Sequence, residues 1–187
     1  MNNFKFIKNK IDKITKNAPH IIENKHSNST LKWVLKLKPD ADLTLKIAAL
    51  CHDIDRSFPK RRIDSRDFND YSVYKKIHAE QSAKITSELM QELAVDKKII
   101  NQIEFLIRNH EIGKRGDSRI LKEADSLSFF EDNLLDYNKR NPKYLKDKIR
   151  MMYTRLPKRA RILVSKMNFE GEEIKKVVKE IISQEEK

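Results

Sequence analysis

The chain has 187 residues, few glycines (3) and prolines (5), a formal net charge of +12 and a single cysteine, Cys51. This length and composition indicate one helical domain and argue against a turn-rich β protein, while the lone cysteine excludes an internal disulfide. No apolar stretch approaches the roughly 20 residues of a membrane span, and the N-terminal segment lacks the continuous apolar run of a secretory signal, so we expect a cytoplasmic protein.

Apolar residues recur at three- and four-residue intervals through the first third of the chain, which is the spacing of one helix face. Pro19 and Pro39 interrupt the pattern, because proline disrupts a helix interior. The small polar residues 27–30 could start the second helix, and Asp40 or Asp42 can cap the third. The expected helices are residues 4–16, one that begins near 27–30 and ends before Pro39, and one from Leu43 into His52.

A polar segment, residues 56–71, follows the third expected helix and is rich in arginine and aspartate. A long segment without regular structure inside a compact domain is often functional. Helical spacing then returns and continues to the C-terminus, interrupted at Gly113, Gly116 and Pro142. The expected helices of this part are residues 73–93, 95–110, 120–135, 144–154 and 172–182, so the fold class is all-α.

Four of the five histidines, together with two aspartates, stand at separations that could bring them to one point. His52 and Asp53 are adjacent at the end of an apolar run. Adjacent side chains on a helix diverge by about 100°, so both can reach the same ions only if the helix ends there. Imidazole and carboxylate groups bind zinc, iron, manganese and nickel, and ligands from several helices can converge inside a bundle. The candidate ligands are His26, His52, Asp53, His78, His110 and Asp125.

This ordered series resembles the HD-domain superfamily of metal-dependent phosphohydrolases. The resemblance rests on His26, on His52-Asp53 after Ile47-Ala48-Ala49-Leu50, and on Asp125 in Ala124-Asp125-Ser126; it covers roughly residues 25–130. His78 and His110 match the binuclear branch of the superfamily. The resemblance implies that His26, His52, Asp53 and Asp125 hold a first metal ion, and that Asp53, His78 and His110 hold a second.

By this resemblance the chain divides into an N-terminal helix (1–19), an HD-like metal-binding core (20–140) and a basic C-terminal helical extension packed on that core (141–187). The implied activity is hydrolysis of a phosphate ester, such as a nucleotide or another small phosphorylated molecule, through a metal-bound hydroxide. One or two divalent ions are expected, from among iron, manganese, zinc, nickel and cobalt.

Two positions depart from the superfamily pattern, which often has glycine and then lysine after the His-Asp pair. Here Asp55 and Arg56 stand there. Arg56 can replace the lysine, since arginine binds phosphate through two hydrogen bonds, whereas Asp55 is unexplained. We expect Asp53 and Arg56 to be the catalytic residues. The expected substrate-binding residues are Arg56, Lys60, Arg61 and Arg62.

Three alternatives stay open at this stage. His20 competes with His26 for the first ligand position, although apolar residues follow His26 at helical offsets. The same ligands would also suit an HD-type diiron oxygenase that cleaves a C–C or C–P bond. Finally, the net charge and the basic stretch 143–161 could indicate a helical module that binds nucleic acid, but no recognition motif supports it.

Overall fold

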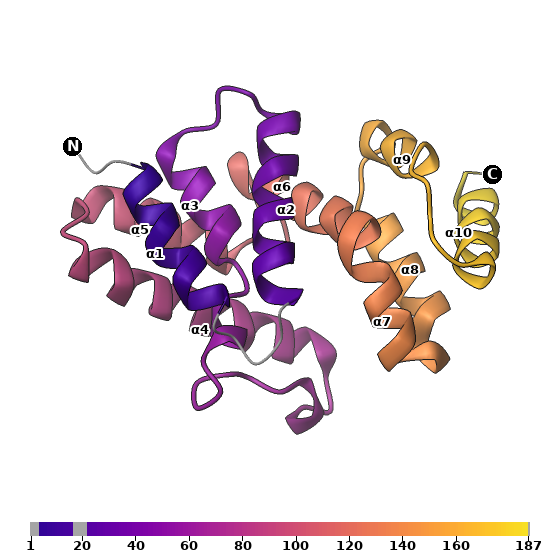
Figure 1. Cartoon of the computed structure of the whole chain (residues 1–187), viewed down its shortest axis with the longest axis horizontal. Coiled ribbons are helices and arrows are strands. Elements are labelled where there is room, and N and C mark those ends of the chain that lie inside the picture. The colour runs from indigo at the N-terminus through magenta and orange to yellow at the C-terminus, as the bar shows by residue number, and fades with distance from the viewer. Residues whose placement is uncertain (1–3, 17–21, 187) are drawn as a thin grey trace. The chain divides into compact units, whose positions relative to one another are not determined.

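The structure is a computed structural model that describes residues 4–16 and 22–186, and all regular elements within these ranges are helical (Figure 1). The all-α prediction is therefore confirmed for this part of the chain. Two compact units are present, Met1–Lys122 and Glu123–Lys187. The domain limits expected from the sequence, after residues 19 and 140, stay predictions. None of the described helices is long and apolar enough to cross a bilayer.

The first unit is a bundle built around a short, almost wholly buried helix, α3. Its sequence is mostly apolar, and it packs against α1, α2, α4 and α5, so that all its residues except Leu43 and Lys46 are buried. Asp42 caps its N-terminus as predicted by accepting a hydrogen bond from the backbone N–H of Leu45 at 2.9 Å. The elements of this unit are α1 (Phe4–Lys16), α2 (Ile22–Leu37), α3 (Leu43–Cys51), η1 (Ile54–Ser57), η2 (Ser65–Asp67), α4 (Tyr71–Glu92), α5 (Lys97–Arg108) and the first half of α6 (Asp117–Ser128).

The second helix begins at Ile22, about one turn earlier than the small polar residues at 27–30 suggested. Ser27, Ser29 and Thr30 do not cap it; they are buried within it. Small side chains on a buried face allow a neighbouring helix to approach closely, and α2 packs extensively on α3. Small polar residues suit both a helix N-terminus and a close contact between helices, so the sequence alone could not distinguish the two. In the structure they belong to a helix contact. Trp33 is buried further along this helix.

The polar segment 56–71 is largely irregular, as predicted; it contains the end of η1 and the short 3₁₀ turn η2 before α4 begins at Tyr71. Beyond it, α4 and α5 form the most extensive helix pair of the unit. Four small residues of α4, Ala79, Ser82, Ala83 and Thr86, are all buried. Cys51 is also buried, which raises the pKa of its thiol to about 12 even though a hydrogen bond with Thr86 opposes the shift.

In the second unit, the helix expected at residues 120–135 is interrupted. It starts earlier, at Asp117, and a π-helical turn at Phe129–Asn133 separates α6 from α7 (Leu134–Arg140). A π turn inserts extra backbone into a helix and changes the direction of the side chains that follow; here both Phe129 and Phe130 are buried. The remaining elements are η4 (Pro142–Tyr144), α8 (Leu145–Thr154), α9 (Lys158–Ser165), which was not predicted, and α10 (Glu172–Glu185).

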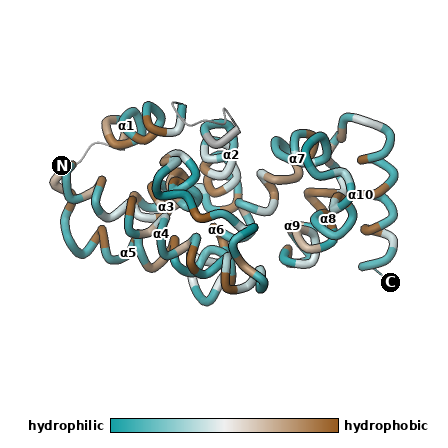
Figure 2. The backbone as a smooth tube through the Cα atoms, turned by 90° about the horizontal axis from the view of Figure 1, so that it is seen from below, coloured by the Kyte–Doolittle hydropathy of each residue, from teal (hydrophilic) through white to brown (hydrophobic). Residues whose placement is uncertain are grey.

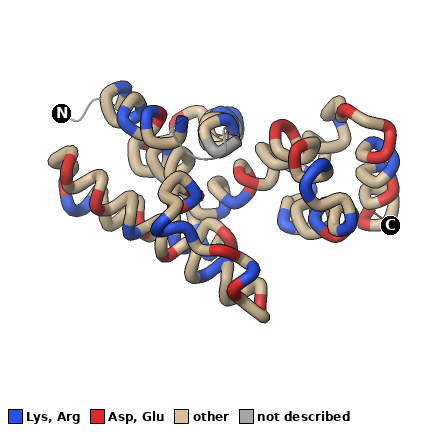
Figure 3. The backbone as a smooth tube through the Cα atoms, turned by 60° about the horizontal axis from the view of Figure 1, so that its bottom comes forward, with Lys and Arg blue, Asp and Glu red and all other residues tan. Residues whose placement is uncertain are grey.

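The basic stretch 143–161 is matched in part by acidic residues of the last helix. Polar and apolar residues alternate along α10 (Figure 2), and its apolar face, with Ile174, Val178 and Ile181 buried, packs against α8. Its polar side carries both signs of charge (Figure 3). Three ion pairs join this helix and its C-cap residue, Glu186, to the basic stretch: Lys146 to Glu180 at 2.5 Å, Arg150 to Glu185 at 3.3 Å and Arg161 to Glu186 at 3.3 Å. Part of the excess positive charge is therefore neutralised within this unit.

Candidate metal centre

The site begins where α3 stops. The helix ends at Cys51, His52 is its C-cap, and Asp53 follows with φ −116° and ψ 19° before η1 begins. Because the backbone leaves the helix between these two residues, their side chains need not diverge as they would within one. The expectation that the helix ends at the His-Asp pair is confirmed.

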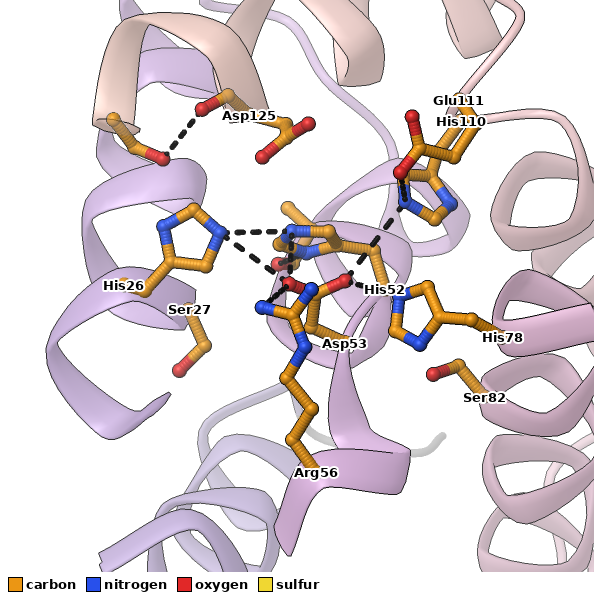
Figure 4. Close-up of polar contacts among 12 residues, drawn as sticks. His26, Ser27, His52, Asp53, Arg56, His78, Ser82, His110, Glu111 and Asp125 are labelled. Atoms are coloured by element: carbon orange, nitrogen blue, oxygen red, sulfur yellow. Dashed lines mark hydrogen bonds and ion pairs between the residues drawn. The ribbon is translucent and has the colours of Figure 1, made fainter. Parts of the chain in front are cut away.

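Three other histidines of the first unit gather around this helix end (Figure 4). His26 comes from the early part of α2, His78 from α4, and His110 lies two residues beyond the end of α5. The ring centroids of His26 and His52 are 5.0 Å apart, those of His52 and His110 5.2 Å, and those of His78 and His110 6.0 Å. All four residues are at most 3% exposed, so the cluster is an interior feature of the unit.

Asp53 divides these histidines into two pairs. Its Oδ2 lies 3.7 Å from Nε2 of His26 and 3.8 Å from Nε2 of His52. Its Oδ1 lies 2.7 Å from Nε2 of His78 and 3.9 Å from Nε2 of His110 (Figure 4). Each carboxylate oxygen thus lies near a different pair of imidazoles. A carboxylate shared by two metal ions needs this arrangement.

The spacing of the donor atoms suits metal binding. The Nε2 atoms of His26 and His52 are 3.1 Å apart. Two nitrogens at the usual zinc distance of about 2.0–2.1 Å in a tetrahedron would be roughly 3.3 Å apart. Asp53, His78 and His110 each offer one atom within 4.8 Å of the others. These buried side chains could therefore hold a metal ion.

Two of the rings have a defined orientation because their Nδ1 atoms face backbone carbonyl oxygens. His52 Nδ1 donates to Ala49 O at 3.0 Å, and His110 Nδ1 donates to Ile107 O at 2.7 Å. A carbonyl can only accept, so the proton sits on Nδ1. In the neutral ring, Nε2 then carries the lone pair and points toward Asp53, as a metal ligand requires.

Arg56 compensates the charge of Asp53, since its Nη1 lies 2.5 Å from Asp53 Oδ2. Burial alone would raise the pKa of Asp53, but the positive charge of Arg56, with His52 and His78, holds it well below the usual value. Burial opposes protonation of His78, yet the charge of Asp53, the hydrogen bond to Asp53 and the close Asp55 carboxylate hold its pKa well above the usual value. Cationic groups thus surround Asp53 on both sides.

The other expected substrate-binding residues are placed differently from Arg56. Lys60 and Arg62 are exposed on the segment after η1. Arg61 donates to Glu88 of α4 at 2.6 Å, and this hydrogen bond lowers the pKa of Glu88. A phosphate group would have to compete with Glu88 for this guanidinium. Of the four residues, Arg56 is the one that contacts a predicted metal ligand, Asp53, within the described part of this unit.

The sixth expected ligand, Asp125, lies on the part of α6 that belongs to the second unit. Within that unit its Oδ2 is 3.1 Å from Nη2 of Arg155, and both side chains are 10% exposed. Its relation to the other five residues stays a prediction. His20, the rival of His26, lies outside the residues that the structure describes.

Two carboxylates near the histidines, Asp55 and Glu111, were not among the expected site residues. Asp55 is completely buried, accepts a hydrogen bond from Ser82 at 2.9 Å and lies 3.0 Å from His78 Nδ1. Glu111 pairs with Lys75 at 2.9 Å and lies 3.7 Å from His110 Nε2. Both carboxylates stand within two residues of a candidate ligand, which was the one signal available from the sequence.

Comparison with known proteins assigns the chain to a family but does not identify an activity. The model of a family described as "Domain of unknown function (DUF4202)" matches residues 8–178. The chain belongs to this family. All six expected metal ligands fall inside the matched part of the DUF4202 domain. No curated protein and no solved structure is significantly similar to the chain. The function of this DUF4202 protein must therefore be argued from its site.

Proposed function

We propose that this protein is a metal-dependent phosphohydrolase of the HD-domain type, which hydrolyses a phosphate ester such as a nucleotide or a related small phosphorylated molecule. The observation that supports this most directly is the position of Asp53, whose two oxygens face two different pairs of buried imidazoles. The same residues carry the resemblance to the HD-domain superfamily.

In this proposal His26, His52, Asp53 and Asp125 hold the first ion, and Asp53, His78 and His110 hold the second. We include Asp125 because it stands one helical turn after Leu121 on the same face of α6, and Leu121 is fully buried. Metal ions bound there would lower the pKa of a coordinated water and neutralise phosphoryl oxygens.

Arg56 has two tasks in this proposal. In the metal-free protein its guanidinium neutralises Asp53. With cations bound at Asp53 that charge is compensated, and Arg56, whose side chain is 29% exposed, becomes able to turn toward a substrate. A guanidinium can grip a phosphate through two parallel hydrogen bonds and stabilise the negative charge that develops on it.

The test is elemental analysis of protein purified without added metal, paired with phosphate release from a panel of nucleotides and sugar phosphates. We expect one or two metal ions per wild-type chain. His52→Ala and Asp53→Ala should lose both metal and activity, whereas Asp67→Ala, at an exposed aspartate outside the cluster, should keep both. A wild-type protein without metal, or an Asp53→Ala variant with full activity, would refute the proposal.

The same donor set also suits a diiron oxygenase, because imidazole and carboxylate ligands serve both chemistries. Iron in the purified protein, a mixed-valence EPR signal and oxygen consumption would favour that reaction; phosphate release without oxygen favours the hydrolase. A nucleic-acid-binding module is less well supported, since acidic residues of α10 pair with three of the cations in the basic stretch. It would bind with steep salt dependence and be indifferent to His52→Ala.

A further inference from the structure

Two of the expected histidine ligands, His52 and His110, are oriented by backbone carbonyl groups at the ends of helices. The last turn of a helix leaves carbonyl oxygens without the N–H four residues on that would normally occupy them. His52 is the C-cap of α3 and His110 follows the end of α5, so each ring reaches the carbonyl three residues before it. These two residues need no further partner to fix the proton on Nδ1.

His78 has no such carbonyl available. It lies within the second turn of α4, a helix of 22 residues, where backbone carbonyls are engaged by the helix itself. Its ring is fully buried, so water cannot take the place of an acceptor. To present Nε2 to a metal, His78 needs an acceptor for its Nδ1 proton from another part of the fold.

Asp55 stands where that acceptor is required. Its Oδ1 lies 3.0 Å from Nδ1 of His78, and it also accepts the hydroxyl proton of Ser82 at 2.9 Å. Ser82 is one helical turn after His78 (Figure 4), so both side chains reach Asp55 from the same face of α4. The other oxygen, Oδ2, accepts the backbone N–H of Ile63 at 3.3 Å. A fully buried carboxylate is costly unless such partners surround it.

We propose that Asp55 is a positioning residue that holds the His78 ring with its Nε2 toward Asp53 and thereby sets the affinity of the second metal ion. This inference rests on the proposed function, and it accounts for the aspartate at a position where the superfamily pattern often has glycine. The bound group is a divalent cation of the imidazole-binding class, such as zinc. Carboxylates that accept from a metal-bound imidazole orient the ring and increase its basicity.

A purely structural role for Asp55 is the rival explanation, because its contact with Ile63 also anchors the segment after η1. The two roles predict different results. Loss of an anchor would lower the stability of the first unit and affect both metal sites alike. Loss of the positioning contact would affect the second site alone.

The experiment measures zinc affinity by calorimetric titration of metal-stripped protein in two backgrounds. His26→Ala removes a ligand of the first site only, and His110→Ala removes a ligand of the second site only. Into each background we introduce Asp55→Ala, Asp55→Asn and, as a matched control that removes the other side-chain partner of Asp55, Ser82→Ala. Thermal unfolding of every variant reports on the fold.

In the His26→Ala background, Asp55→Ala is expected to weaken zinc binding by about 10- to 100-fold, the usual range for the loss of such a partner. Asp55→Asn, which keeps an acceptor oxygen but not the charge, should cause a smaller loss, and Ser82→Ala the smallest. In the His110→Ala background all three should leave zinc affinity within about twofold. Equal losses in both backgrounds, or no loss in either, would overturn the proposal. Asp55→Asn keeps the test decisive if Asp55→Ala does not fold.

A second readout does not depend on metal binding. Nitrogen-15 NMR of the metal-free protein, at a pH where the rings are neutral, distinguishes a proton on Nδ1 from one on Nε2. Both ring nitrogens of His78 face a carboxylate, Asp55 at Nδ1 and Asp53 at Nε2. The fraction of His78 with the proton on Nδ1 should therefore fall in Asp55→Ala, whereas His110 should not change. If the wild type binds no zinc, the proposed function fails, while this measurement still decides whether Asp55 orients His78.

Discussion

Arg56 shows how one side chain can substitute for a bound cation. Its guanidinium lies 2.5 Å from Asp53 at a place where four buried imidazoles also converge. Without a positive charge there, burial would favour the protonated form of Asp53. The contact therefore favours the ionised form of Asp53 in the metal-free protein, and His52 and His78 favour it as well, so Asp53 does not depend on Arg56 alone.

This position leads to a prediction for Arg56→Ala. Metal content should stay at the wild-type level, whereas KM for the phosphate ester should rise or turnover should fall at least about tenfold, because a contact to developing phosphate charge is lost. Arg56→Lys should recover part of the loss, since lysine keeps the charge without the fork-shaped donor set. Steady-state kinetics with elemental analysis make the measurement. Arg66→Ala, at an exposed arginine outside the expected site, serves as the control, and loss of metal from Arg56→Ala would contradict the assignment.

At the residue scale, the sequence predicted the members of the cluster better than their partners. The order and helical spacing of the histidines were enough to group His26, His52, Asp53, His78 and His110, which the first unit brings together. The role of Asp55 could not be predicted, because it depends on where α4 places His78 relative to a helix end. The ion pair of Arg61 with Glu88 was equally hidden, since it joins residues 27 positions apart.

At the element scale, strongly periodic helices were predicted well and weak or interrupted ones were not. α1 was predicted at its observed limits, and the end of α3 at the His-Asp pair was correct. α9 was missed because it has eight residues, several of them basic, and only Ala160 and Val164 are buried. The π turn after α6 has no signal in the spacing of apolar residues, because it depends on how Phe129 and Phe130 pack.

The cap of α3 gives a prediction at this scale. Asp42→Ala should lower the free energy of unfolding by about 1 kcal/mol at pH 7, because the N–H of Leu45 loses its acceptor. Asp42→Asn should lose only a fraction of this, since asparagine also caps helices. Urea unfolding followed by circular dichroism measures both. Asp40→Ala is the matched control: Asp40 is the exposed aspartate that was the other candidate cap, and its loss should have little effect.

The same cap should make stability depend on pH. Burial would raise the pKa of Asp42, but hydrogen bonds from Thr44 and Leu45 outweigh it and lower the pKa from the usual 3.8. A carboxylate with a lowered folded-state pKa contributes stability that is present above its unfolded-state pKa and is lost as the pH falls through the folded-state value. The difference between wild type and Asp42→Asn should therefore shrink below about pH 4. An unchanged difference in acid would contradict this explanation.

At the scale of the whole molecule, metal binding should be coupled to stability. Ligands that bind only the folded state add about 2.7 kcal/mol when present at 100 times their dissociation constant. For a chain of this length that corresponds to a rise in melting temperature of roughly 5–11 °C. Calorimetry of wild-type protein with zinc and with a chelator should show this difference. Asp53→Ala, which removes the shared ligand, should melt at the same temperature in both; an equal shift in the variant would argue against this site.

The charge of the molecule is distributed in a way that net charge alone does not reveal. The +12 excess is large for 187 residues. Yet cations of α8 and α9 are bridged to α10, and Lys38 is bridged to Asp117 at 2.8 Å, which raises the pKa of this lysine. Exposed pairs of this kind contribute little stability, but each places a negative charge beside one of the cations.

Trp33 gives the molecule an optical reporter. It is the single tryptophan of the chain and lies buried on α2, seven residues after His26. Seven residues are two turns, so the indole stands on the same side of the helix, about 10 Å along its axis from His26. Fluorescence emitted at that range is open to quenching by energy transfer to a coloured ion such as Co²⁺. Occupancy near His26 could thus be followed by light in the unlabelled protein.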